Sequence, residues 1–195
     1  SSNRWSTIYL VLDRTCNSCY ARCMDGTCNV QERDFLRESN AIEDIWDDAS
    51  LVTAEQAWLY LRDKPRLSDA VIRKTHKILM AGHIAPLFPE LEPKLADKKY
   101  LGHYRDVPVY IAGRQGLPYW IIKDQLQYWI LLANKPMVWE QIKEHHVFYE
   151  RIHPFIDGNG RTGRLFLNWQ RVRSGHDVIV IPECTKYTDY YKWFK

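Results

Sequence analysis

The sequence predicts a mainly α-helical protein with one small β element. Apolar residues recur at helical spacing through most of the chain, and only one short stretch has the alternation of a β-hairpin. No internal repeat or low-complexity tract is present. With 195 residues, of which 46% are hydrophobic and 26% charged, the chain has the size and composition of one ordinary globular domain with room for a small appendage.

The expected helices have recognisable start and stop signals. Ser68 is a typical N-cap, Thr53 and Gln56 form a capping-box pattern, Pro65 ends a helical pattern, and Gly175 follows another. Helices are therefore expected over residues 31–47, 53–64, 68–82, 123–133, 139–152 and 161–173, with a last aromatic helix from about 185. The proline-rich residues 83–100 are expected to be irregular, and residues 178–181 resemble a short strand.

The β element is expected between residues 104 and 116. The run Tyr104–Ile111 is rich in β-branched residues and partly alternates, and Gly113 and Gly116 supply turn residues. Pro108 cannot donate to a ladder, which favours an edge position. A strand pair or hairpin is the prediction for this stretch.

Charge and hydropathy narrow the classes of partner. The net charge is +3, without the clustered basic excess of a nucleic-acid-binding protein, so no nucleic-acid partner is expected. No apolar run approaches the length of about 18 residues that a membrane span requires. The expectation is a soluble, cytoplasmic protein without membrane contact, and a homo-oligomer is left open.

Four of the five cysteines crowd together near the N-terminus, at Cys16, Cys19, Cys23 and Cys28. Their spacing could bind a metal, but it lacks the two separated C-x2-C pairs of typical zinc sites. Disulfides are a second interpretation, and free thiols are favoured over both. Residues 1–30 are therefore expected to form a cysteine-containing extension before the main domain, 31–195.

The most informative stretch is the loop His153–Arg164, with the sequence HPFIDGNGRTGR. Gly158 and Gly160 allow a sharp turn and a close approach of the backbone to a ligand. Free N–H groups and the dipole at the start of the following helix form an anion site. Arg161 and Arg164 share a face of the first helical turn, and two guanidinium groups at that position suit a polyphosphate.

The same loop holds candidates for a metal ligand and a base. Asp157 offers one hard oxygen ligand, and Mg²⁺ sites that serve nucleotides often use one or two carboxylates plus phosphate oxygens. His153 can act as a general base near neutral pH. These groups are the components of phosphoryl or nucleotidyl transfer. The simpler alternative is a glycine-rich loop with a salt bridge between Asp157 and one arginine.

This run resembles the signature HxFx(D/E)GNGRxxR of the Fic (filamentation induced by cAMP) family at every defined position. The resemblance extends over roughly residues 35–195 and implies a Fic-type helical bundle with a β-hairpin flap near 104–112. It also implies transfer of AMP from Mg·ATP to a Ser, Thr or Tyr hydroxyl of a target protein. Other Fic chemistries stay open, namely transfer of UMP or phosphocholine and removal of AMP. A nucleotide-binding interaction module is the non-enzymatic alternative.

The resemblance assigns a role to each residue of the loop. His153 would take the proton of the attacking hydroxyl, Phe155 would seat the loop, and Asp157 would hold Mg²⁺. The phosphates would bind to Gly158, Asn159 (also through its side-chain amide), Gly160, Arg161 and Arg164. A kinase relative carries Lys at the position of Gly160, so the glycine favours nucleotide transfer.

Two further features follow from the resemblance. Ser39 and Glu43 match the inhibitory pattern (S/T)xxxE(G/N), except that Asp44 stands at its last position, and they imply an inhibitory helix near 35–46. The hypothesis is that Glu43 pairs with Arg164 in the resting enzyme; a solvated surface acid is the alternative for Glu43. In the flap, the residues expected to dock the target are Val107, Val109 and Ile111.

Overall fold

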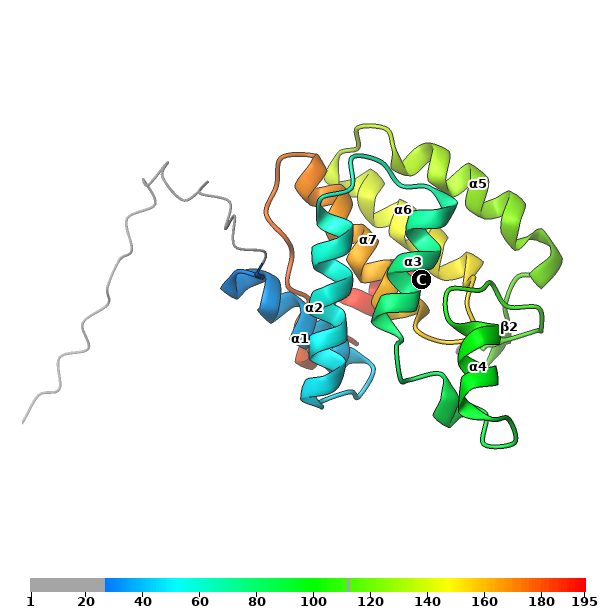
Figure 1. The fold of residues 1–195 in the computed structure, drawn as a ribbon. Helices are drawn as coiled ribbons and strands as arrows, with labels where there is room; N and C mark the ends of the chain where they lie inside the picture. Colours follow the sequence, from blue (N-terminus) through cyan, green and yellow to red (C-terminus); the bar gives the residue numbers. More distant parts are fainter. Residues whose placement is uncertain (1–26, 112) are drawn as a thin grey trace, which may run out of the picture.

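The computed structural model describes residues 27–111 and 113–195, and this part of the chain is mainly helical, as predicted (Figure 1). Its α-helices are α1 (Val30–Ile42), α2 (Asp48–Arg62), α3 (Asp69–Leu79), α4 (Pro93–Tyr100), α5 (Ile122–Ala133), α6 (Trp139–Ile152) and α7 (Asn159–Arg173). Short 3-10 turns are η1 (Ala85–Leu87), η2 (Tyr119–Ile121), η3 (Glu183–Thr185) and η4 (Tyr190–Phe194). The strands β1 (Tyr110–Ile111) and β2 (Arg114–Gln115) form one antiparallel hairpin.

The helix α7 lies at the centre of the fold, with α2 and α3 on one side and α6 on the other (Figure 1). Every residue from Arg161 to Gln170 is buried, so this helix is surrounded on all faces. Aromatic side chains from the neighbouring helices fill the space around it, among them Trp58, Trp129 and Tyr149. Because α7 begins immediately after the glycine-rich loop, the packing of α7 in the core fixes the position of the loop's end.

Helix boundaries agree with the sequence where a local cap sets them. Ser68 accepts a hydrogen bond from the N–H of Val71 at the start of α3, and α6 spans the expected residues. The prediction for α2 was wrong at its start, because Asp47 caps the helix by accepting from the N–H of Ser50. Thr53 therefore lies inside α2.

Four other predictions need correction. The helix α1 ends at Ile42 instead of near Asp47, and Trp46 beyond it is 69% exposed, so it is no part of a buried face. The supposedly irregular stretch contains α4, which Pro93 opens at the first helical turn, where its missing N–H costs nothing. Residues 178–181 form no strand, and the last residues form 3-10 turns instead of an α-helix.

The hairpin exists but is shorter than expected and lies further along the chain. Tyr110 pairs with Gln115 and Ile111 with Arg114, and Gly113 takes a positive φ of 77° in the turn. Pro108 lies before β1, outside the ladder, so its missing N–H breaks no strand pairing. Residues 104–108 lead into the hairpin, and at its base the Val109 carbonyl accepts from the N–H of Gly116 at 2.8 Å.

Cys16, Cys19 and Cys23 lie outside the described residues, so their expected state stays a prediction. Cys28 is half-buried beside α1, and burial raises the pKa of its thiol to about 11. Such a thiol is a weak nucleophile at neutral pH. Within residues 27–111 and 113–195, no helix has the length and apolar character needed to cross a membrane.

Candidate active site

His153 is the C-cap of α6 and the first residue of the loop. Its backbone takes a left-handed conformation (φ 48°, ψ 63°), which is uncommon for a residue other than glycine. Its Nδ1 lies 3.2 Å from the carbonyl oxygen of Glu150. Since a carbonyl only accepts, Nδ1 carries the proton and Nε2 keeps a free lone pair. Burial lowers the pKa of His153 and favours the neutral form that a general base requires.

Phe155 and Asn159 close the loop on itself. Phe155 is fully buried, its N–H donates to the Asn159 side-chain oxygen (2.9 Å), and the Asn159 amide donates to its carbonyl (3.0 Å). The seating role expected of Phe155 agrees with this burial. Both polar atoms of that buried side chain bind the loop backbone, and the expected contact of the Asn159 amide with a phosphate stays a prediction.

Gly158 ends the loop and caps α7 with a φ of 74°. A Cβ at this position would collide with the side chain of Met80, so glycine is required by conformation and by space. The N–H groups of the first turn of α7 have no partners within the helix and point toward the loop. This arrangement fits the anion site that the sequence predicts at this helix N-terminus.

Arg161 belongs to the first turn of α7, next to this candidate anion site. Its side chain is 4% exposed; Nη2 lies 3.0 Å from the Met80 sulfur and 4.0 Å from the Asp157 carboxylate. Its Nε and Nη1 are buried and have no hydrogen-bond partner within the described part of the chain. Leaving charged N–H groups unpaired in a buried position costs free energy, so a bound anion would resolve the conflict.

Asp157 is the candidate metal ligand, and its side chain is 46% exposed, so its carboxylate is accessible. Among the described residues, no group of three or more His, Cys, Asp or Glu residues could hold a metal ion. One accessible carboxylate beside an anion site fits Mg²⁺, which accepts phosphate oxygens and water as its other ligands.

Arg164, one turn further along α7, contacts α1. Its Nη2 lies 2.7 Å from Glu43 Oε1, and its Nε donates to the Ser39 hydroxyl at 2.8 Å. The ion pair between Glu43 and Arg164 that the sequence suggested is therefore present. Glu43 is the C-cap of α1, and a Cβ on Gly160 would collide with its carboxylate. Gly160 thus leaves the space that Glu43 occupies.

Sequence analysis did not predict the buried polar side chains around Arg164. The Tyr190 hydroxyl lies 3.4 Å from Arg164 Nη1 and 2.8 Å from His146 Nε2. Glu150 packs its carboxyl against Gly163, and burial raises the pKa of that carboxyl to about 8. These side chains come from η4 and α6, and no local sequence pattern predicts that they lie close together.

His76 is buried, and both of its ring nitrogen atoms are hydrogen-bonded. Its Nδ1 accepts from the N–H of Gly102 at 3.0 Å, so Nε2 carries the proton and donates to the carbonyl of Asp157, also at 3.0 Å. Its ring stacks on Phe155 with centroids 3.7 Å apart. His76 therefore fixes the backbone of the candidate metal ligand, a role that the sequence did not indicate.

The residues expected to dock a target are half-buried. Val109 and Ile111 lie over Gly116, while Tyr110 between them is 74% exposed. Pro108 is exposed, and Val107 is half-buried before β1. The hairpin thus has an exposed edge next to a packed base.

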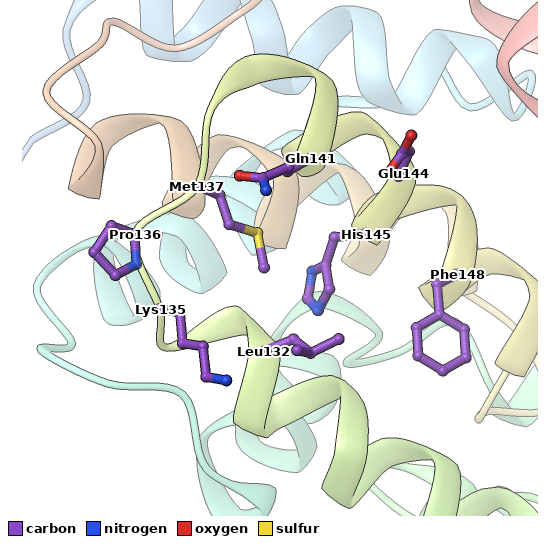
Figure 2. A pocket seen from close by; sticks show the side chains of 8 residues that line it. All are labelled: Leu132, Lys135, Pro136, Met137, Gln141, Glu144, His145 and Phe148. Atoms are coloured by element: carbon purple, nitrogen blue, oxygen red, sulfur yellow. The ribbon is translucent and has the colours of Figure 1, made fainter.

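A separate surface hollow of about 310 Å³ lies between the end of α5 and α6, lined in part by Leu132, Met137, His145 and Phe148 (Figure 2). No residue of the loop 153–164 lines it. Both ring nitrogen atoms of His145, which lines this hollow, are hydrogen-bonded within the protein, to the Trp129 carbonyl and the Gln170 side chain. The loop is the better candidate site, because the unpaired cationic N–H groups and the oriented base are found there.

The fold and the loop together define a family. The model of the Fic/DOC family matches residues 66–170, and this chain belongs to that family. Among curated relatives, the protein adenylyltransferase Fic of Drosophila mojavensis is 28% identical over 184 residues, covering 88% of this chain and 30% of the relative. The protein adenylyltransferase Fic of Drosophila erecta is 44% identical over 50 residues, which are 26% of this chain and 10% of the relative.

Solved structures give the same fold. Fic-1 (residues 134–508) of C. elegans has a TM-score of 0.66 at 19% identity, covering 90% of this chain and 59% of that one. A Fic-domain signaling protein of Bacteroides thetaiotaomicron has a TM-score of 0.65 at 19% identity, covering 83% and 70%. The chain spans about a quarter to a third of the two curated relatives that align over the longest stretches.

Proposed function

We propose that this protein is a protein adenylyltransferase that moves AMP from Mg·ATP to a Ser, Thr or Tyr hydroxyl of a target protein. One observation supports this above all: His153, oriented by the Glu150 carbonyl, begins the loop that leads into α7, and the first turn of α7 carries a buried Arg161 with two nitrogen atoms that lack a partner among the described residues. A base next to an anion site is what attack of a hydroxyl on a phosphate ester requires. The names of the curated relatives support the same chemistry.

In this proposal, His153 Nε2 accepts the proton of the target hydroxyl as its oxygen forms a bond to the α-phosphorus. The bond from that phosphorus to the departing pyrophosphate breaks at the same time. The N-terminal N–H groups of α7 and the guanidinium of Arg161 stabilise the negative charge that develops. Asp157 holds Mg²⁺, which neutralises charge on the phosphates when bound. Val107, Val109 and Ile111 dock the target backbone at the hairpin edge.

Autoinhibition by Glu43 is part of the proposal. Arg164 is the second motif arginine, and its guanidinium is occupied by Glu43 and by both oxygens of Ser39. While these contacts persist, Arg164 cannot pair with the outer phosphates of a nucleotide. Release of Glu43 frees the arginine for that role.

Removal of AMP from a modified protein is the second candidate function. The Glu43 carboxylate is 39% exposed, and it is near enough to His153 to influence the pKa of its imidazole. In that position it could orient a water molecule toward a phosphate ester. This activity would need Glu43, whereas transfer would be restrained by it.

The test is label transfer from α-labelled ATP with Mg²⁺, using self-modification as the readout. Wild type, Glu43→Gly and Glu43→Gly/His153→Ala are compared. We expect label in Glu43→Gly, and a loss of about 10²–10⁴-fold when His153 is also removed. Labelled UTP tested beside ATP shows which base is used. If ATP binds to Glu43→Gly but no label is transferred to the chain or to proteins of a cell extract, AMP transfer is contradicted.

A further inference from the structure

Arg105 is a buried arginine whose guanidinium binds only backbone. It is 2% exposed and donates to four carbonyl oxygens: His153 (2.7 Å), Leu117 (2.6 Å), Val107 (3.1 Å) and Ile152 (3.4 Å). Among the described residues, no salt bridge to Arg105 is present. Burying a cation costs free energy, and here hydrogen bonds to backbone carbonyls offset that cost. The bonds of Arg105 therefore hold backbone segments in position.

Two of these carbonyls belong to the C-terminal end of α6. The last carbonyls of a helix have no partners within it, and a cation there is favourable. The backbone N–H of Arg105 also donates to the carbonyl of Pro154 at 2.9 Å. Arg105 thus holds three consecutive carbonyls, 152–154, around the left-handed turn that directs the imidazole of His153.

The other two carbonyls flank the hairpin. Val107 precedes β1 and Leu117 follows β2, so one side chain ties both ends of the hairpin together. A backbone bond from the Gly116 N–H to the Val109 carbonyl also closes the base of the hairpin. Arg105 links that base to the end of α6.

We propose that Arg105 is a positioning residue that sets the distance and orientation between the base His153 and the target-docking hairpin. This inference rests on the proposed function, since it assumes that a target hydroxyl is presented by the hairpin. A target strand aligned on the hairpin edge places its hydroxyl at a fixed point. One planar guanidinium bonded to both partners keeps the base at that same point.

Lysine cannot replace this side chain. Its compact ammonium has three donors on one nitrogen, whereas the planar guanidinium spreads five donors over three nitrogens and here reaches four carbonyls. Loss of the bonds to either partner would let the base and the hydroxyl separate. A displacement of about 1 Å between reacting groups can cost about 100-fold in rate. Nucleotide binding at 157–164 does not involve Arg105 and should persist.

The kinetic test compares Arg105→Lys and Arg105→Gln, each in the Glu43→Gly background. Arg171→Lys is the matched control, because Arg171 also donates to a carbonyl (Asp177, 3.0 Å) but lies at the far end of α7. We expect kcat for transfer to fall about 10–100-fold in both Arg105 variants, with ATP affinity by calorimetry within about twofold. An unchanged kcat, or a loss of ATP affinity as large as the loss of kcat, overturns the inference.

A second measurement does not depend on activity. Amide hydrogen exchange in Arg105→Lys should rise in both 107–117 and 153–158, while α2 and α3 stay as in the wild type. A rise in only one of these segments, or an equal rise everywhere, overturns the coupling. Absence of transfer in Glu43→Gly with Arg105 intact would instead count against the proposed function, so the two failures are distinguishable.

Discussion

The carboxylate of Glu43 lies 2.7 Å from the guanidinium of Arg164, although 121 residues of chain separate them. The arginine side chain is 3% exposed and the glutamate 39% exposed, so the cation is held in the core and the anion sits at its open side. An anion arriving from solvent would have to take the place of Glu43. This geometry supports the proposal that Glu43 competes with an incoming anion for Arg164.

Ser39→Ala should weaken this restraint. The hydroxyl of Ser39 accepts from Arg164 Nε, and loss of a bond to a charged group costs about 1.5–3 kcal/mol of stability. We expect transfer activity to rise, by less than in Glu43→Gly, within the range of about 5–150-fold that couplings between sites span. Ser68→Ala is the control, because it removes a helix cap at about 0.5–2 kcal/mol without touching Arg164. Equal activities of the two variants would contradict the prediction.

Lys186→Met should also raise activity. The Lys186 ammonium donates to the Ile42 carbonyl at the end of α1 (3.2 Å) and lies 3.6 Å from Asp44. It thus fixes the residues on both sides of Glu43, and a cation is favourable at a helix C-terminus. We expect a gain of a few fold in transfer. Lys192→Met, an exposed lysine of the same segment, should leave the rate unchanged.

The rate of Glu43→Gly should stay constant as pH falls through 6.5. Burial lowers the pKa of His153 below its ordinary 6.5, and the charge of Arg105 acts in the same direction. The Glu150 carbonyl, Glu43 and Asp157 oppose the shift, so removing Glu43 lowers this pKa further. The base is active when neutral, so the rate falls only below that lowered pKa. Arg105→Gln should move the acidic limb to higher pH; a limb at or above 6.5 in Glu43→Gly would contradict this.

Glu150→Gln should stabilise the protein at alkaline pH. Burial, and then Glu43, raise the pKa of Glu150 from 4.5 to about 8 against the influence of Arg164. The folded state therefore binds this proton more tightly, and the stability so gained is complete below pH 4.5 and lost as pH rises toward 8. Glutamine removes that loss, which is on the order of 1–2 kcal/mol between pH 6 and pH 8.

Thermal unfolding of Glu150→Gln at several pH values measures this effect. The melting temperature should exceed that of the wild type by about 2–4 °C for each kcal/mol, increasingly toward pH 8. Glu144→Gln, at an exposed position of the same helix, should show no such trend. A constant difference between Glu150→Gln and wild type across pH would refute the assignment.

His76→Gln should raise the Mg²⁺ concentration that half-saturates transfer. His76 donates to the carbonyl of Asp157 and stacks on Phe155, and loss of such a supporting group typically costs about 10–100-fold in metal affinity or activity. The readout is a Mg²⁺ titration at saturating ATP. His145→Gln, a buried histidine bonded to Trp129 and Gln170, is the control. Equal Mg²⁺ requirements in both variants would refute a positioning role for His76.

Local patterns were sufficient for much of the fold. The start of α3 at Ser68, the span of α6 and the end of α7 near Gly175 follow from caps and periodicity within a few residues of each other. The same holds for the loop 153–164, because its conformation depends on glycines and a helix N-terminus that are contiguous in the chain. Predictions were wrong where a local signal had a competitor: Asp47 capped α2 ahead of Thr53, and Pro93 opened a helix in a stretch that prolines had marked as irregular.

The sequence by itself determined the family and, through a family pattern, the pairing partners Glu43 and Arg164; it also predicted the base and the anion loop. Tertiary structure alone decided how these groups are held. Arg105 binds carbonyls on both sides of the hairpin, His76 binds the Asp157 backbone, and Asn159 turns its amide into the loop. Each of these contacts joins a side chain to a backbone carbonyl. Because every residue has such a carbonyl, no sequence pattern predicts which one is bound. These contacts become visible only once α3, α6 and the hairpin lie around the start of α7.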